Sequence, residues 1–446
     1  MRRLTRRGAL LAGAGLLAGC ETIGDTFDSV LGSRETPLPG ERLPVLAAEQ
    51  PLDVDAGSGP LRIPPPGPMP EWAQAGGIVS HAPRHPELGA PLGTAWSVSV
   101  GSGSAYRRRL VAPPIIAGGT VFAMDAYGQV TAVDVARGQR RWELDTRPEE
   151  DDDGALGGGC GFADGVLYVV TGLAEAMAVD PADGSIRWRV GLPAPARGAP
   201  TIAGGKLYVP TVENQLLALS AETGERQWVY RAQQAVTLTL GLPAPAVEGE
   251  VVVAGFGSGE LAALRASDGR LIWSEALASA RGGGFSDISS ITALPVIDRD
   301  RVFAGGLGGI TIAIDLRSGR RLWEREVALA ETPWSAGEAL FLITTGGELV
   351  CFGSDDGRVR WIRPLGRFED EERRRDPITW GPPVLAGGRL LVAGSHGRMA
   401  QVNPADGEVI ARTELSGGVT LAPAIAGGVM VLLTDDAYLV AMTAQA

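Results

Sequence analysis

The sequence predicts an all-β protein, an eight-bladed β-propeller of four-stranded antiparallel blades. First, a Gly-x-x-x-Trp unit recurs at a spacing of about 45 residues, which is a propeller period. Second, a further piece recurs upstream of these units: a small residue, Pro, any residue and Ile or Val, then a Gly-rich turn and a β-branched run. Third, 63 Gly and 31 Pro accompany 45% hydrophobic residues, a composition that favours many short strands over disorder.

Each unit is interpreted as four strands. The Pro-x-Ile piece forms the first strand, a Gly-Gly turn leads into a nearly all-apolar second strand, and the third strand alternates. An Asp-x-x-x-Gly turn then leads to the fourth strand, which carries the Trp, because Asp caps the turn and Gly supplies the positive φ. The unit occurs at Gly138/Trp142, Gly184/Trp188, Gly224/Trp228, Gly269/Trp273, Gly319/Trp323, Gly357/Trp361 and, with Ala in place of Trp, Gly407/Ala411.

The two ends of the repeat array indicate how the ring closes. The last unit, 422–446, stops after its third strand, and an isolated Trp96 stands in the strand-like segment 93–100. We therefore expect this N-terminal strand to complete the C-terminal blade, which removes the free sheet edges. The propeller is predicted over 91–446.

The first 19 residues have the layout of a cleaved signal peptide. Four arginines precede a short apolar stretch that ends in Leu-Ala-Gly before Cys20. The segment resembles a bacterial lipoprotein signal, which implies lipidation of Cys20 and durable anchoring by two or three acyl chains. The alternative is an ordinary secretory signal with an incidental Cys. Arg6-Arg7 leaves the export route open, Sec or twin-arginine, and Glu21 leaves open retention in the inner membrane.

Residues 20–90 are predicted to be a lipidated, Pro-rich tether without regular structure. His81 and His85 have the spacing of a helical metal pair, but Pro83 and Pro86 exclude such a helix. The chain carries a net charge of −12, which disfavours nucleic acid and anionic headgroups as direct ligands.

The sequence contains no recognisable catalytic equipment. Three histidines are too few and too scattered for a metal cluster, no Gly-x-Ser-x-Gly elbow occurs, and two acidic runs are interpreted as solvated loops. Cys160 and Cys351 fall in the second and sixth blades, too far apart for a disulfide, so both are expected to be buried free thiols. We expect no cofactor, no metal and no enzymatic activity.

The repeat resembles the pyrroloquinoline-quinone-type propellers, whose enzymes are dehydrogenases. Those enzymes are similar to one another in an adjacent Cys–Cys pair, which this chain lacks. A periplasmic quinone- or sugar-binding enzyme is therefore kept only as an alternative, beside a scaffold of another envelope complex.

The lipoprotein signal, Pro-rich segment and eight blades together resemble the BamB family. That resemblance implies an outer-membrane lipoprotein on the periplasmic face, a non-enzymatic scaffold of the β-barrel assembly complex. It implies docking on the periplasmic POTRA domains of a BamA-type subunit, beside other subunits of the complex. It leaves open whether unfolded barrel clients also bind.

The resemblance also implies a docking surface from two neighbouring loops. The family's Leu-x-Leu-Arg motif corresponds here to Leu238, Leu240 and Gly241, so both leucines match and the arginine does not. The family's Asp-x-Asp pair corresponds to Ser290 and Thr292, with Asp287 slightly upstream. The stretch 234–241 is independently unusual, an interblade connection with alternating β-prone residues. The alternative is that the two leucines only cover the blade edge.

Overall fold

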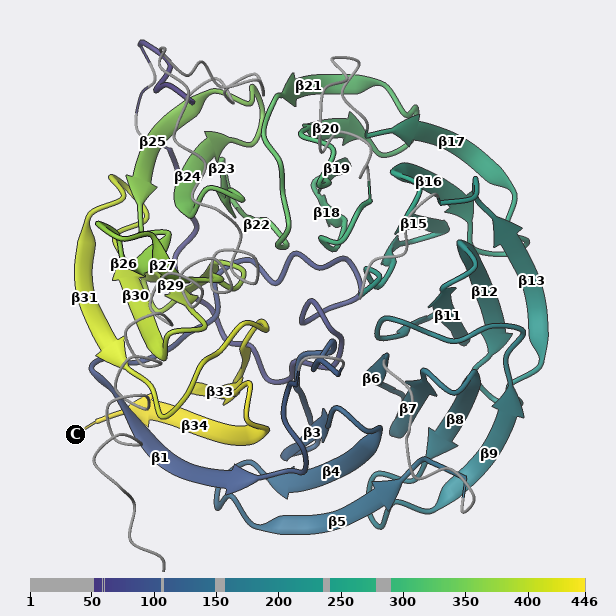
Figure 1. Ribbon diagram of the computed structural model, residues 1–446. Helices are drawn as coiled ribbons and strands as arrows, with labels where there is room; N and C mark the ends of the chain where they lie inside the picture. The colour runs from purple at the N-terminus through teal and green to yellow at the C-terminus, as the bar shows by residue number, and fades with distance from the viewer. Residues whose placement is uncertain are drawn as a thin grey trace, which may run out of the picture. The chain divides into compact units, whose positions relative to one another are not determined.

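The computed structural model describes residues 52–57, 59, 61–105, 108–148, 157–235, 241–277 and 290–445, all within one compact unit, 50–446. These residues form β-strands, turns and irregular segments and no helix, and so no helix among them could cross a membrane. Eight four-stranded antiparallel sheets follow one another around a ring (Figure 1). The predicted eight-bladed propeller is thereby confirmed.

Within each of the first seven blades the strands run in chain order from the axis to the rim. Blades 1 and 2 contain β2 (Ile115–Ala117), β3 (Thr120–Met124), β4 (Gln129–Asp134), β5 (Arg140–Asp145), β6 (Gly158–Ala163), β7 (Val166–Thr171), β8 (Glu175–Val179) and β9 (Ile186–Gly191). Blades 3 and 4 contain β10 (Thr201–Ala203), β11 (Lys206–Thr211), β12 (Gln215–Ser220), β13 (Arg226–Arg231), β14 (Ala246–Glu248), β15 (Val251–Gly255), β16 (Glu260–Arg265) and β17 (Leu271–Ala276). Blades 5 and 6 contain β18 (Val296–Asp298), β19 (Arg301–Gly305), β20 (Thr311–Asp315), β21 (Arg321–Arg325), β22 (Trp334–Ala336), β23 (Ala339–Ile343), β24 (Glu348–Gly353) and β25 (Val359–Pro364). Blade 7 contains β28 (Val384–Ala386), β29 (Arg389–Ala393), β30 (Arg398–Val402) and β31 (Val409–Glu414), and a hairpin of β26 (Phe368–Asp370) and β27 (Arg375–Pro377) precedes it.

Blade 8 joins the first strand of the chain to its last three strands. Its sheet order is β1 (Leu92–Ser99), β34 (Tyr438–Ala444), β33 (Val429–Leu433) and β32 (Ala424–Ala426). The antiparallel register sets Trp96 opposite Ala441 and Val98 opposite Leu439. The predicted closure by the N-terminal strand is confirmed, because β1 pairs with β34 as the fourth strand of this sheet.

The Gly-x-x-x-Trp unit is explained by contacts between neighbouring blades. The Trp142 indole donates its Nε1–H to the Pro181 carbonyl of the next blade, at 2.9 Å. The same ring covers Gly184, where an added Cβ would lie 2.8 Å from Trp142 Cε3 and where φ is +80°. Each glycine of the repeat therefore receives the tryptophan of the preceding blade. Seven pairs share this arrangement: Trp96–Gly138, Trp142–Gly184, Trp188–Gly224, Trp228–Gly269, Trp273–Gly319, Trp323–Gly357 and Trp361–Gly407.

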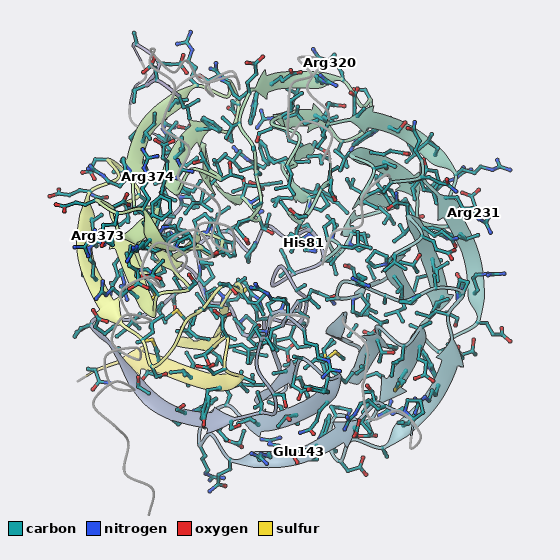
Figure 2. The ribbon with its side chains drawn as sticks, viewed as in Figure 1. His81, Glu143, Arg231, Arg320, Arg373 and Arg374 are labelled. Atoms are coloured by element: carbon teal, nitrogen blue, oxygen red, sulfur yellow. The ribbon has the colours of Figure 1, made fainter. Side chains whose placement is uncertain are left out.

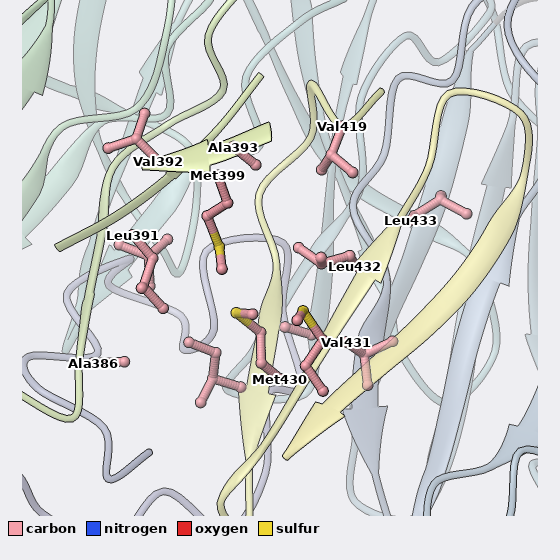
Figure 3. Close-up of a cluster of buried hydrophobic side chains, with 14 of the residues drawn as sticks. Ala386, Leu391, Val392, Ala393, Met399, Val419, Met430, Val431, Leu432 and Leu433 are labelled. Carbon is pink, nitrogen blue, oxygen red and sulfur yellow. The ribbon is translucent and has the colours of Figure 1, made fainter. Parts of the chain in front are cut away.

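Ala411 marks the one blade junction without a tryptophan. It faces blade 8, whose third and fourth strands come from opposite ends of the chain, so no Asp-x-x-x-Gly turn connects β34 to β1. A tryptophan at 411 would have no receiving glycine, and Ala411 is exposed. Deeper in this junction, blades 7 and 8 pack through aliphatic side chains and methionines, including Met399 and Met430 (Figure 3). Methionine suits such a contact because it adapts to irregular gaps.

Residues 62–86, here named the axial plug, lie across the centre of the ring (Figure 1). Trp72 pairs with Ile116 of β2 through both backbone hydrogen bonds, at 2.7 and 2.9 Å. Oxygen atoms of the plug accept an N–H from the innermost strand, or the turn after it, in every blade. These N–H donors, in blade order, are Ile116 to Trp72 O, Phe162 to Ala73 O, Ile202 to Gln74 Oε1, Val247 to Val79 O, Ile297 to Ser80 O, Glu338 to Arg62 O, Gly387 to Pro86 O and Gly427 to Met69 O.

The expectation of a free tether up to residue 90 is therefore corrected over this segment. Trp72 is 1% exposed and stacks on Trp334, with ring centroids 6.2 Å apart. The segment lacks a sequence period because its eight partners are arranged around a circle, and no regular strand or helix can reach them all. Its prolines and glycines allow the required changes of direction.

The plug lies at one end of the axial channel. In an antiparallel blade the turn after the first strand and the connection to the next blade lie at opposite ends of the strands. The plug contacts the first of these two sets, and we call that side the plug face. The other side, which carries the interblade connections, is called the connection face.

Candidate functional site

The predicted docking residues fall partly outside the described chain. Leu238, Leu240 and Asp287 lie outside the described residues, as does the predicted lipidation site, Cys20. Gly241, Ser290 and Thr292 are described, and all three lie in connections on the connection face.

Two of the three described docking candidates come together at the axis. Gly241 and Thr292 both line a cavity of about 320 Å³, named here the axial cavity. Thr292 is half-buried and donates its hydroxyl to the Ala330 carbonyl at 3.1 Å. Ser290, by contrast, is 1% exposed, and its carbonyl accepts the Leu307 N–H at 3.0 Å. The structure therefore places the Ser290 side chain inside the body rather than on a docking surface.

The axial cavity belongs to the connection-face half of the channel. Ala75 of the plug is part of its lining, and the remaining lining comes from the segments that lead into the inner strands. Leu242, Leu294 and Leu421 contribute apolar walls. The volume lies at the lower end of the range of roughly 300–1,000 Å³ for small-ligand pockets.

Glu331 is the acidic residue of this lining. Glu331 is half-buried, and the surrounding cavity wall desolvates its carboxyl, which raises the pKa to about 8. Among the described residues, no group donates a hydrogen bond to its carboxylate or forms an ion pair with it. Arg109 also lines the cavity, but it is exposed and makes no ion pair with Glu331. An acidic group held in a confined space without a partner is a candidate functional group.

Sequence reasoning missed Glu331, although a signal for it exists in the repeat. Seven blades have an inner strand of three residues, and each such strand follows a proline directly. Three positions before these strands the residue is small or apolar in all blades except blade 6, where Glu331 stands. The aligned residues are Ala112, Gly198, Pro243, Ala293, Glu331, Gly381 and Leu421.

The two plug histidines have structural partners. His81 is buried, its Nδ1 lies 2.8 Å from the Pro295 carbonyl, and desolvation lowers its pKa to about 4. His85 accepts the Gly388 N–H at Nε2, at 2.8 Å, so its Nδ1 donates to the Pro64 carbonyl. Within the described ranges no group of three or more His, Cys, Asp or Glu side chains is arranged to hold a metal ion.

The cysteines are as predicted. Cys160 and Cys351 are free and buried, in blades 2 and 6. Burial raises the pKa of the Cys160 thiol to about 12, and it raises the pKa of Cys351 as well. Both thiols therefore stay protonated and unreactive at neutral pH.

Fold and repeat define this chain as an eight-bladed propeller of the quinoprotein-like repeat class. The sequence profile of the family described as outer membrane protein assembly factor BamB matches residues 92–154, 145–363 and 365–446. The chain belongs to this family.

Curated relatives agree over most of the chain. Outer membrane protein assembly factor BamB of Yersinia pestis is 27% identical over 356 residues, which cover 78% of this chain and 88% of that protein. The protein of the same name from Burkholderia pseudomallei is 28% identical over 356 residues, covering 76% and 85%. The one from Escherichia coli K12 is 26% identical over 359 residues, covering 78% and 88%.

Solved structures show the likeness of fold. BamB from Moraxella catarrhalis has a TM-score of 0.67 at 21% identity and covers 79% of this chain and 100% of its own. Quinohemoprotein alcohol dehydrogenase from Comamonas testosteroni has a TM-score of 0.65 at 14% identity, covering 84% and 81%. Because propellers of one shape include both an assembly factor and a dehydrogenase, the fold alone does not select between these functions.

Proposed function

We propose that this chain is a non-enzymatic scaffold lipoprotein that acts in outer-membrane protein assembly. Its family membership over residues 92–446 carries this proposal. In this role Cys20 bears the lipid, and the propeller stands on the periplasmic face of the outer membrane. The buried, unreactive thiols agree with a protein that works through its surface.

The partner proposed is a BamA-type subunit, bound through its POTRA domains at the connection face. Gly241 and Thr292 line one cavity on that face, which supports a single docking region built from the blade 3–4 and blade 4–5 connections. Leu238, Leu240 and Asp287 belong to the same two connections in the sequence. Because the charged residues of the family motif are missing here, this proposal has two forms: docking rests on apolar contact, or the partner's surface differs correspondingly.

The plug favours the scaffold over the dehydrogenase alternative. Residues 62–86 fill the plug-face end of the channel, where their oxygen atoms accept a backbone N–H from every blade. A quinone at that end would have to displace Trp72 and its neighbours.

The test is capture of the full-length native chain from detergent-solubilised envelope membranes. We expect a BamA-type subunit to co-purify, and the double variant Leu238→Asp/Leu240→Asp to lose most of it. The matched control is Ile410→Asp, which places one acid on an apolar residue that is 55% exposed at the rim of blade 7. Capture of a different envelope complex, or undiminished capture by the folded double variant, would contradict the proposed partner or its site.

Anchoring is tested separately. Cys20→Ser should abolish incorporation of labelled palmitate and release the folded chain from the membrane fraction. Retention of the label in that variant would refute lipidation at Cys20.

A further inference from the structure

The axial cavity is bounded at one end by the plug, and its wall carries an acid that has no hydrogen-bond or ion-pair partner among the described residues. Ala75 belongs to that end, so the cavity lies on the connection-face side of the plug. Glu331 is part of the wall, and among the described residues its carboxylate has no donor. The electrostatic cost of ionising this group falls when a cation enters the same confined space.

We propose that the axial cavity receives one cationic side chain, an arginine or a lysine, which a docked polypeptide presents at the connection face, with Glu331 as its counter-ion. The cationic group supplies the hydrogen-bond donor that Glu331 lacks among the described residues. A carboxylate accepts two parallel hydrogen bonds from a guanidinium, so arginine is the better fit of the two.

The rest of the lining suits such a side chain. Leu242, Leu294 and Leu421 offer apolar surface to the methylene stem, as long basic side chains require when their charged end is buried. Thr379 and Thr420 supply hydroxyl groups in the same cavity. The net charge of −12 attracts a basic segment toward the protein. Arg109 opposes the cation only weakly, because its side chain is exposed and its charge is screened by solvent.

Other ligand classes fit less well. An anion would be repelled by the ionised form of Glu331, and a metal ion would need further acidic or imidazole ligands that the described residues do not supply. The identity of the polypeptide rests on the proposed scaffold function. The preference of the cavity for a cationic side chain does not, and it is tested without any partner.

The probe is N-acetylarginine amide, with uncharged N-acetylcitrulline amide of nearly the same shape as its control. The full chain is labelled with ¹³C at glutamate carboxyl groups, and the Glu331 resonance is identified by its loss in Glu331→Gln. Without ligand this resonance should titrate near pH 8. Saturating arginine amide should lower the midpoint by at least one pH unit, which corresponds to about tenfold tighter binding to the ionised form.

Two variants complete the test. Glu331→Gln should lose the arginine-specific effect while keeping the circular dichroism and melting behaviour of the parent, because Gln is nearly isosteric. Glu143→Gln, which changes an exposed acid on β5 at the rim (Figure 2), should bind the probe as the parent does. Equal effects of arginine and citrulline amides would overturn the inference. So would unchanged arginine binding by Glu331→Gln, or a ligand-free midpoint near 4.5, which would mean that the Glu331 carboxyl is already solvated or paired.

The outcomes separate this inference from the proposed function. If arginine amide binds at Glu331 while no barrel-assembly subunit is captured, the preference of the cavity for a cation is supported and the scaffold assignment is refuted. If the subunit is captured and the arginine and citrulline amides have the same effect, the scaffold assignment is supported and this inference is refuted.

Discussion

At the rim of the ring, one tryptophan contact is repeated at seven junctions, whereas at the axis one non-repeating segment contacts all eight blades. Each rim contact joins two neighbours, so its loss weakens one junction. The plug joins blades that are distant in the ring, and Trp72 is more deeply buried than the rim tryptophans. The tryptophans at the rim connect neighbouring blades only, whereas a single extended segment at the axis connects all eight blades to one another.

The largest effect is expected from Trp72→Ala. Removal of this fully buried indole should lower the free energy of unfolding by about 3–5 kcal/mol. Trp142→Ala at the rim should cost less, because that ring is half-buried. Trp72→Phe, which retains an aromatic ring against Trp334, should recover much of the loss. Denaturant unfolding measures all three, and an equal loss for the rim and plug variants would remove the distinction between the two regions.

The next effect depends on pH and on one histidine of the plug, His81. The pKa of His81 is about 4 in the folded chain and about 6.5 when unfolded, so below pH 6.5 the unfolded state takes up a proton that the folded state refuses. The contribution of His81 to stability should fall by up to about 3 kcal/mol as pH decreases from 6.5 to 4. The raised pKa of Glu331 acts in the opposite direction between pH 8 and 4.5, so the quantity that matters is the difference between the parent and a variant at residue 81. His81→Asn tolerates the φ of +60° and should remove the His81 part, while Glu331, His85 and His396 contribute to both proteins alike. Unfolding midpoints of both proteins between pH 4 and 7 decide the matter; parallel curves would exclude His81 as the source.

A smaller effect isolates the rim contact from backbone strain. Gly184 and Gly205 both have positive φ, +80° and +70°, so an alanine at either one costs roughly 1–2 kcal/mol in backbone conformation. Only at Gly184 would the new Cβ also meet the Trp142 ring, at 2.8 Å, whereas at Gly205 nothing lies within 4 Å. Gly184→Ala should therefore be the more destabilising of the two in thermal unfolding. Equal losses would mean that the glycine serves the turn and not the tryptophan.

The smallest effect is expected at the junction without a tryptophan. Ala411→Trp should change stability by no more than about 0.5 kcal/mol, because blade 8 has no turn glycine to receive the ring. Calorimetry of this variant beside the parent measures it. A stabilisation of several kcal/mol would show that the junction can accept a tryptophan without the glycine.

The site was less predictable from the sequence than the fold. The family resemblance indicated Gly241 and Thr292, and the structure brings these two together at the axial cavity. Glu331 belongs to no catalytic motif, and its signal in the sequence is a departure from the repeat in one blade. Sequence reasoning also misjudged residues 62–86, because a segment that binds eight different partners repeats nothing.

The sequence by itself determined the blades, their number and the closure by β1. These follow from local rules, the turn residues and the spacing of tryptophans, which each blade repeats. Only the tertiary structure decided that the plug lies at the axis, and that Glu331 lines a cavity there without a partner among the described residues. Each of these depends on where distant segments meet once the ring has closed, and the spacing of residues along the chain carries no record of that meeting.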